Sequence, residues 1–348
     1  MAEFTTPGDD TIVGDLGGDV LWGDIDGTLF GVGGNDRIFG LTFSDQLTGD
    51  AKTIAPEGRG GDDFISGGDG EDVIFGDASE TLWGWGGNDT LYQDAGGSYM
   101  AGDAAILGAG AHGGADRLFG GGLLYGDASS NMNGAVGGND VLDADAAIEA
   151  ARLFGDSGAV MSGKSLGGRD KLDGGSFGDV LMGDAFTVTD VSVGGKDTLS
   201  GWGGADKMYG DADTMGTFGR GGNDILRGGA GNDELFGDAS LMFDFARGGN
   251  DRLLGGSGDD QLWGDGRLNQ SAVGGADQFE FSGSFGKDKI FDFRQGDGDV
   301  IRITGHVAAE ATIAVVGTDT VISTLQNSSI TLVGFTGELG MGVDVIFA

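Results

Sequence analysis

A repeat of about 27 residues runs through most of this chain of 348 residues, and it constrains the fold more than any other feature. In each repeat a Gly-rich group ends in Asp, and a separate Gly-Asp pair follows in the same register. One complete unit, residues 221–247, divides into three pieces of about nine residues. A unit this short cannot bury its own apolar side chains, whereas stacked units bury a continuous column of them. The repeat therefore predicts a solenoid.

Apolar residues recur at one fixed place in each piece of the repeat. The first ladder is Ile12, Ile38, Ile65, Leu91, Leu118, Leu142, Leu172, Leu199, Leu226, Leu253 and Phe279. The second ladder is Leu21, Leu47, Ile74, Met100, Leu124, Leu153, Leu181, Met208, Leu235 and Leu262. The third ladder is Leu29, Ile54, Leu82, Leu107, Met132, Val160, Val188, Met215, Met242 and Leu268. Ladders of this kind predict an all-β fold, a parallel β-solenoid of about ten 27-residue coils.

The third ladder bears on the shape of each coil. A triangular coil with three short sides accounts for it, while a two-sided roll with a surface loop in every coil does not require it. We favour the three-sided coil and keep the two-sided roll as the alternative. Residues 93–153 depart from the repeat, because Ser98 and Gly122 stand where Asp is expected and residues 144–154 replace a loop, with a short helix as one outcome.

Composition excludes several classes of protein. The chain has 56 Asp and Glu residues against 19 Lys and Arg, a formal net charge of −37, so nucleic acid is not an expected partner. It has no Cys and only 2 His, which excludes disulfides and thiolate metal sites and argues against zinc. No apolar run reaches the length of a transmembrane segment.

Stacking the repeats also stacks their Asp residues. The first-loop column is Asp10, Asp36, Asp63, Asp89, Asp116, Asp140, Asp170, Asp197, Asp224, Asp251 and Asp277. Two carboxylates one coil apart, about 4.8 Å, repel by roughly 3 kcal/mol at an effective dielectric constant near 20. Such a column opposes folding unless cations lie between its members. Calcium suits it, because calcium accepts six to eight oxygen ligands in flexible geometry.

Four segments of the chain match one nonapeptide closely. They are GGDGEDVIF (67–75), GGSFGDVLM (174–182), GGAGNDELF (228–236) and GGSGDDQLW (255–263). The pattern resembles the calcium-binding repeat of RTX proteins, G-G-x-G-x-D-x-U-x with U large and apolar. The resemblance runs from Gly8 to about Asp277 and implies that the Asp at the sixth position and loop carbonyls hold Ca²⁺ between successive turns.

The resemblance implies metal ligands in two or three columns. It places calcium on the first-loop column and on a second-loop column made of Asp72, Asp179, Asp206, Asp233 and Asp260. The Gly-Asp pairs form a further column, the Gly-Asp column, made of Asp24, Asp50, Asp77, Asp103, Asp127, Asp156, Asp184, Asp211, Asp238 and Asp265. The Gly-Asp column could bind calcium, or its side chains could cap turn amides. Fewer metal sites are expected between residues 93 and 153.

The last seventy residues have a different pattern. Residues 278–348 alternate polar and apolar side chains, which predicts a cap of about six strands over the end of the solenoid. We therefore expect a calcium-binding solenoid at 1–277 and a β-rich cap at 278–348. The terminal DVIFA looks like a type I secretion signal, and its structural alternative is a final edge strand.

The resemblance implies a secreted protein that leaves the cell unfolded through a type I system and folds on Ca²⁺ outside. We expect a structural or adhesive role at the cell surface or matrix, with self-association or surface glycans as contacts. A soluble glycan-binding module is the alternative. An enzyme, such as one that modifies polysaccharides, is not expected, because the repeats begin at Gly8 and leave no room before them for a catalytic domain.

An aromatic-rich stripe follows the second ladder by one residue. It is Trp22, Phe75, Tyr125, Phe154, Met182, Tyr209, Phe236 and Trp263. Strand alternation places these side chains outside, where they could bind sugars or a second rod. Alternatively, the chain turns a corner at the next Gly-Asp pair and the stripe fills that corner, which is the interpretation we favour.

Overall fold

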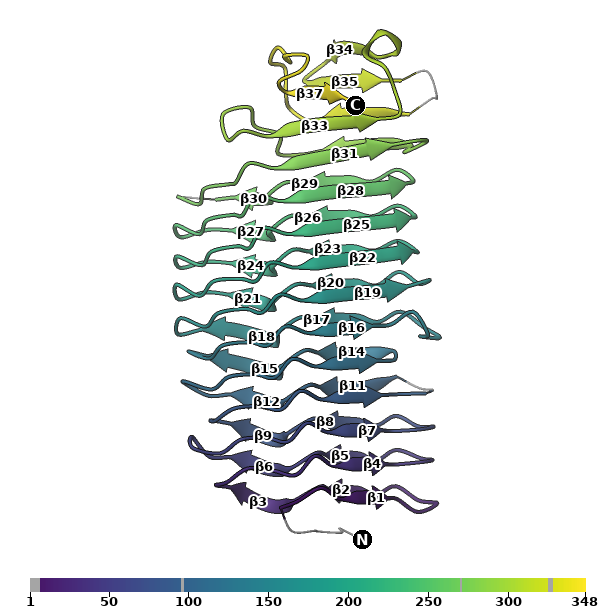
Figure 1. Ribbon diagram of the computed structural model, residues 1–348. Coiled ribbons are helices and arrows are strands. Elements are labelled where there is room, and N and C mark those ends of the chain that lie inside the picture. The colour runs from purple at the N-terminus through teal and green to yellow at the C-terminus, as the bar shows by residue number, and fades with distance from the viewer. Residues whose placement is uncertain (1–6, 95–96, 270, 325–327) are drawn as a thin grey trace.

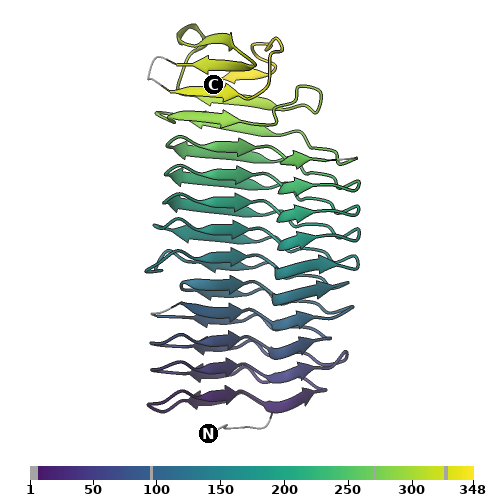
Figure 2. The same ribbon diagram turned by 180° about the vertical axis from the view of Figure 1, so that it is seen from behind.

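The computed structural model describes residues 7–94, 97–269, 271–324 and 328–348. Successive coils stack into a rod, with the N-terminal coil at one end and the C-terminal strands at the other (Figures 1 and 2). Most coils contribute three short strands, and equivalent strands of neighbouring coils pair in parallel to make three sheets. The prediction of a three-sided parallel β-solenoid is confirmed.

The strands divide by sheet as follows. The 13-stranded sheet contains β1 (Thr11–Val13), β4 (Arg37–Phe39), β7 (Phe64–Ser66), β10 (Thr90–Tyr92), β13 (Arg117–Phe119), β16 (Val141–Asp143), β19 (Lys171–Gly175), β22 (Thr198–Gly203), β25 (Ile225–Ala230), β28 (Arg252–Ser257), β31 (Gln278–Ser282), β33 (Val300–Thr304) and β37 (Val345–Phe347). The 14-stranded sheet contains β2 (Val20–Trp22), β5 (Gln46–Thr48), β8 (Val73–Phe75), β11 (Ser98–Ala101), β14 (Gly122–Tyr125), β17 (Arg152–Phe154), β20 (Val180–Met182), β23 (Lys207–Tyr209), β26 (Glu234–Phe236), β29 (Gln261–Trp263), β32 (Lys287–Ile290), β36 (Ser329–Leu332), β35 (Asp319–Ser323) and β34 (Thr312–Val316). The 10-stranded sheet contains β3 (Ile25–Leu29), β6 (Ala51–Ile54), β9 (Ala78–Leu82), β12 (Ala104–Leu107), β15 (Ala128–Asn133), β18 (Ser157–Ser162), β21 (Ala185–Val188), β24 (Ala212–Met215), β27 (Ala239–Met242) and β30 (Arg267–Leu268).

The strand register confirms the apolar ladders. Ile12 pairs with Ile38 in the first ladder and Leu21 pairs with Leu47 in the second, and this alignment continues along the rod. One position of the third ladder was assigned wrongly. Met161, not Val160, pairs with Met132 and is fully buried, because β18 has an additional residue relative to the next strand, β21.

The ladders form two separate cores. The first and second ladders pack against each other in one core, since two of the three sheets face one another there. The third ladder packs in a second core with the Ala residues that follow most Gly-Asp pairs, such as Ala78 and Ala212. Most of the aromatic-rich stripe forms a third cluster, in which Phe75 to Phe236 are 3–8% exposed. The stripe therefore fills a corner of the coil, which is the interpretation we favoured, and most of its side chains are not exposed.

The C-terminal segment prolongs the solenoid. Strands β31 and β32 pair in parallel with β28 and β29, so two of the sheets run on past residue 277. Beyond them, β34, β35 and β36 pair in antiparallel fashion, and a single turn of 3-10 helix, Ala308–Glu310, precedes them. The insert at 144–154 contains turns followed by β17 and no helix. Across the described ranges, no helix has the length and apolar character that a membrane crossing requires.

Candidate metal centre

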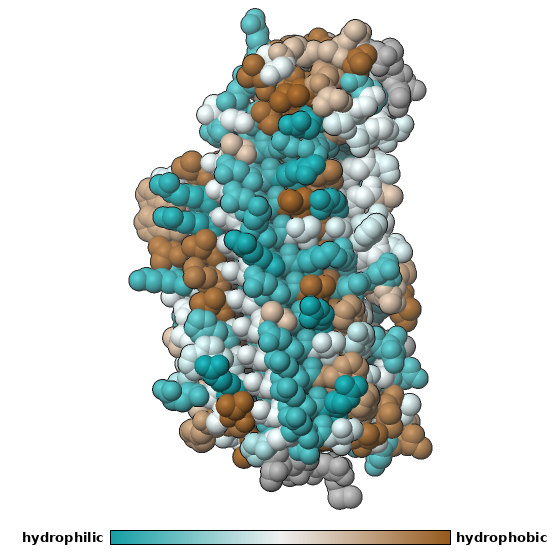
Figure 3. All heavy atoms as spheres, in the orientation of Figure 1, coloured by the Kyte–Doolittle hydropathy of each residue, from teal (hydrophilic) through white to brown (hydrophobic). Residues whose placement is uncertain are grey.

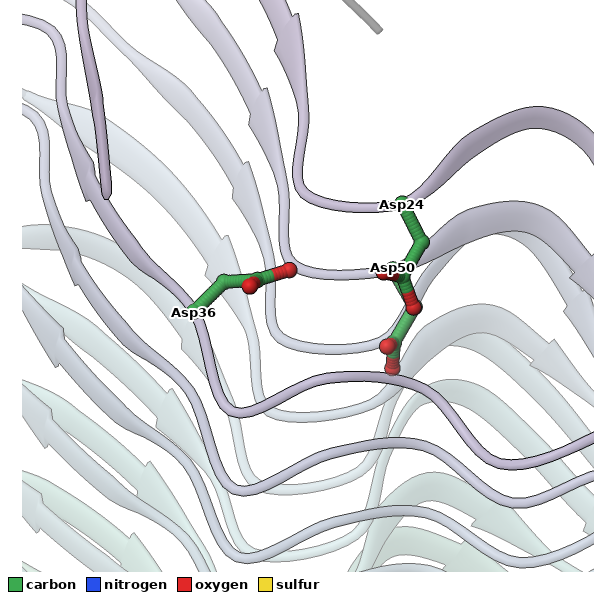
Figure 4. A group of neighbouring side chains, drawn as sticks. All are labelled: Asp24, Asp36 and Asp50. Carbon is green, nitrogen blue, oxygen red and sulfur yellow. The ribbon is translucent and has the colours of Figure 1, made fainter. Parts of the chain in front are cut away.

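Two of the predicted Asp columns face each other inside the rod. Asp36 projects from the first loop of its coil toward Asp24 and Asp50, which lie on successive Gly-Asp turns (Figure 4). One carboxylate oxygen from each of these three buried residues lies within 4.8 Å of the other two. The sequence placed the first-loop and Gly-Asp columns in separate parts of the coil, and the fold brings them together.

From Asp36 onward, each carboxylate of the first-loop column accepts a backbone hydrogen bond on one oxygen, Oδ1. Asp36 Oδ1 accepts the backbone N–H of Asp10 at 2.7 Å, and Asp63 Oδ1 accepts that of Asp36 at 2.6 Å. The same bond links successive coils up to Asp251 and Asp277. From Asp36 to Asp277 these residues are at most 3% exposed, and their Oδ2 atoms have no hydrogen-bond partner among the described residues. A buried charged oxygen without a partner is costly, so each marks a place for a cation.

The Gly-Asp column both caps turns and leaves oxygens free. Asp127 Oδ1 accepts the backbone N–H of Gly138 at 2.8 Å, and Asp238 Oδ1 accepts that of Gly249 at 2.6 Å. The other carboxylate oxygen, Oδ2, has no partner in the described parts of the chain in either residue. The capping interpretation of this column is therefore confirmed, and it is compatible with metal binding because a carboxylate has two oxygens.

Glycine makes room for this arrangement of oxygens. A Cβ atom added to Gly126 would lie 1.7 Å from the carbonyl oxygen of Gly155 and 2.2 Å from Oδ2 of Asp140. The equivalent Gly residues, Gly23, Gly49 and Gly76 among them, meet a carbonyl and a first-loop carboxylate in the same way. Only a residue without a side chain lets the Gly-Asp turn approach the first-loop carboxylate this closely.

Burial and mutual repulsion favour the protonated form of these carboxyls. Burial raises the pKa of Asp36 to about 7, and the neighbouring Asp24 and Asp10 add to the shift. Burial together with Asp265 and Asp238 raises the pKa of Asp277 to about 10. At neutral pH these carboxyls can all be ionised only if bound cations compensate their charge. The carboxylates and carbonyls of the columns offer only hard oxygen ligands, which calcium prefers. The residues present therefore fit calcium.

The second-loop column lies at another edge of the coil and is longer than predicted. Asp179 Oδ1 accepts the backbone N–H of Ala151 at 2.7 Å, and the predicted Asp72, Asp206, Asp233 and Asp260 have equivalent bonds from the preceding coil. Three further members were not predicted: Asp19, Asp45 and Asp288 make or accept the same bond. The second ladder could have located two of them, because Asp19 and Asp45 stand two residues before Leu21 and Leu47.

Two side chains beyond residue 277 contact the C-terminal end of the Gly-Asp column. Arg294 Nη1 lies 3.4 Å from Oδ2 of Asp265, the last member of the column. Asp292 accepts the backbone N–H groups of Gly264, Asp265 and Gly266, where an additional coil would have presented carbonyls. Neither role was predictable, because Arg294 and Asp292 do not belong to the repeat.

The comparisons with known proteins agree with this geometry. A model of the RTX calcium-binding nonapeptide repeat matches seven segments of the chain, 4–26, 30–51, 57–80, 81–99, 194–214, 218–240 and 245–266. The chain carries RTX calcium-binding repeats. No RTX segment is matched between residues 100 and 193, a stretch that includes Gly122 and Ala151, which stand at second-loop Asp positions.

No curated protein sequence matches this chain. Among solved structures, the extracellular lipase LipA from Serratia marcescens is similar to it, with 17% sequence identity and a TM-score of 0.23. The match covers 90% of this chain and 40% of the lipase, so the chain spans well under half of the lipase's length.

Replacing Asp127 by Asn should have opposite effects with and without calcium. The Asn side chain keeps an oxygen for the Gly138 amide but removes a charge, so we expect calcium affinity to fall about tenfold. Without calcium the folded form should gain stability, because burial and the facing Asp140 raise the pKa of Asp127 well above its usual value. Calcium titration followed by circular dichroism measures both. The exposed Asp145→Asn is the control, and equal behaviour of the two variants would contradict the role of the column.

Proposed function

We propose that this chain is a secreted calcium-binding RTX protein that folds outside the cell and has a structural or adhesive role at the cell surface or matrix. The observation that carries the proposal is the pair of facing Asp columns, in which one oxygen of nearly every buried carboxylate has no partner among the residues that the structure describes. Above neutral pH such a core is stable only when cations occupy it, so calcium concentration decides whether the rod forms.

The mechanism uses the charge of the chain itself. Where free calcium is scarce, repulsion among carboxylates, within a net charge of −37, keeps the chain unfolded and exportable. Where calcium is millimolar, a concentration that saturates typical extracellular sites, each bound ion cross-links successive coils and its binding energy becomes folding energy. The first-loop, second-loop and Gly-Asp columns would hold these ions.

Two further features support export. The chain has no Cys, so folding outside the cell does not depend on disulfide formation. The terminal Val345–Phe347 forms strand β37 at the edge of the 13-stranded sheet, paired with β33. A segment that is a strand in the folded protein is still available as a type I secretion signal while the chain is unfolded.

An exposed apolar edge supports the adhesive role. Val191, Phe218 and Phe245 are 44–55% exposed on the turns that follow β21, β24 and β27, where Figure 3 shows apolar side chains gathered along the edge at the left. The Phe218 and Phe245 rings stack 5.3 Å apart. Both residues have φ near +65°, a conformation that costs about 1–2 kcal/mol. Exposed, strained apolar residues in a row suit contact with another apolar surface, such as a second rod.

We propose a scaffold in preference to an enzyme. Two segments, 163–167 and 174–178, match the hydrolase pattern G-x-S-x-G, yet both lie at turns or bends of the solenoid. A nucleophile elbow requires a strand followed by a helix. The glycan-binding alternative depended on the aromatic-rich stripe, most of which is buried.

Sedimentation velocity in chelator and in millimolar Ca²⁺ tests the proposed function. We expect a slow, expanded species in chelator and a compact species in calcium that associates as protein concentration rises. Magnesium at the same concentration is the control, because its stricter octahedral geometry suits these sites less. An unchanged sedimentation coefficient would contradict calcium-driven folding. A compact species that stays monomeric would retain the calcium dependence and contradict the scaffold.

A further inference from the structure

One side chain enters a calcium loop from the position where most coils have glycine. Strand register aligns Tyr92 of β10 with Ser66 of β7, so Gln93 occupies the place of Gly67 in the following coil. The same place holds Gly14, Gly40, Gly174, Gly201, Gly228 and Gly255 in the other coils with a complete second loop. Gln93 is therefore a specific departure at the start of the fourth coil.

The Gln93 amide lies within the second loop of the third coil. Its Nε2 atom donates to the carbonyl oxygens of Gly68 and Gly70, each at 3.0 Å. Gln93 is 6% exposed, and Asp72, which belongs to the same loop, is 1% exposed. A Cβ atom on Gly67 would lie 2.3 Å from Gln93 Oε1 and 2.4 Å from Asp72 Oδ2, so the amide and the carboxylate share one small space.

The same loop also lacks its next carboxylate. In the preceding coil, Asp45 donates its backbone N–H to Asp72 Oδ1 at 2.8 Å. Asp72 donates to Ser98 Oγ instead, at 3.4 Å, because Ser98 occupies the Asp position of the fourth coil. One oxygen ligand is lost and two N–H donors are gained at the same point. Calcium needs oxygen lone pairs, and the two donors of the amide occupy those of the carbonyls.

We propose that Gln93 replaces a calcium ion between the third and fourth coils. Its amide satisfies the loop carbonyls that would otherwise bind metal, so the second-loop column is divided into a block that ends at Asp72 and a block that runs from Asp179 to Asp288. This proposal rests on the proposed calcium binding, and it identifies one second-loop position where no calcium binds. At this second-loop edge, the third and fourth coils are held by hydrogen bonds that need no metal.

Restoring the repeat at this edge should create a calcium site. We expect Gln93→Gly combined with Ser98→Asp to bind at least one more Ca²⁺ per chain than wild type, measured by elemental analysis after dialysis against buffered calcium. Gln93→Glu replaces the donors with an oxygen at nearly constant shape, and it should also gain one ion. Thr336→Asp, which adds a carboxylate at an exposed position of the C-terminal segment outside the calcium loops, is the matched control and should gain none.

The outcomes separate this inference from the proposed function. Wild type that binds no calcium would overturn the proposed function and the inference with it. Wild type that binds calcium, with neither Gln93 variant exceeding it, would overturn the inference alone. An equal gain in Thr336→Asp would also overturn it, because added charge rather than the contact between the third and fourth coils would then explain the binding. A gain confined to either Gln93 variant supports the substitution of amide for metal.

Discussion

Replacing Gly126 by Ala is expected to destabilise the calcium-bound fold by about 3 kcal/mol, at the upper end for overpacking, because the surroundings are backbone and a fixed carboxylate. The new methyl group would overlap the Gly155 carbonyl oxygen and Asp140 Oδ2, both at 2.2 Å or less. Relief requires neighbouring coils to separate, which would also widen the space between the two Asp columns. Calcium titration followed by circular dichroism should show folding at a markedly higher calcium concentration.

Gly31→Ala is the matched control for this experiment. A Cβ atom at Gly31 meets no atom within 4 Å, so the same change of residue should leave the calcium midpoint nearly unchanged. If Gly126→Ala folded at the calcium concentration of wild type, close approach of the Gly-Asp turn to the first-loop carboxylate would not matter for the site. If both variants lost stability equally, the effect would belong to glycine's backbone freedom in general.

The metal-free chain is expected to gain β-structure as the pH is lowered from 8.5 to 5. Burial raises the pKa of Asp36, Asp206 and Asp260 to about 7 and that of Asp288 to about 8. A carboxyl whose pKa is higher in the folded state than in the unfolded state favours folding at low pH, and its contribution is lost as the pH rises through the folded-state pKa. The loss should begin near the unfolded-state pKa of about 4 and be complete for these four groups by about pH 8.

Calcium should reverse this dependence. Each ion must displace protons from the carboxyls, so the calcium concentration needed for folding should rise about tenfold per pH unit for each proton released as the solution is acidified. Circular dichroism in calcium-depleted buffer and in a calcium series at each pH measures both trends. Metal-free stability that increased with pH would contradict the buried, unpaired state of the columns.

The ladders and the second-loop Asp residues were predictable because they depend on the period alone. Leu21 and Leu47 repeat in step with the coil, and every apolar side chain at that spacing must face the same way. Met161 was missed because an additional residue in β18 shifts the register locally, which a regular period cannot reveal. The period therefore identifies the stacked residues wherever successive strands keep the same length.

The pairing of the two inner Asp columns was not predictable from the period. Asp24 and Asp36 are twelve residues apart, and the angles of the intervening turns decide whether their side chains meet. Gln93 was missed for a different reason. In the sequence, a residue that departs from a repeat indicates only that the repeat is imperfect. The contacts of Gln93 with Gly68 and Gly70 form only when the coils are stacked.

The contact between Arg294 and Asp265 gives the rod a direction. In an array of similar coils, ordering can begin anywhere, because each coil depends only on its neighbours. Here one end of the Gly-Asp column carries a cation that is part of the chain and cannot diffuse away. The coil at that end should therefore require the least free energy to order when calcium is scarce. The other coils should then order one after another from this coil toward the N-terminus.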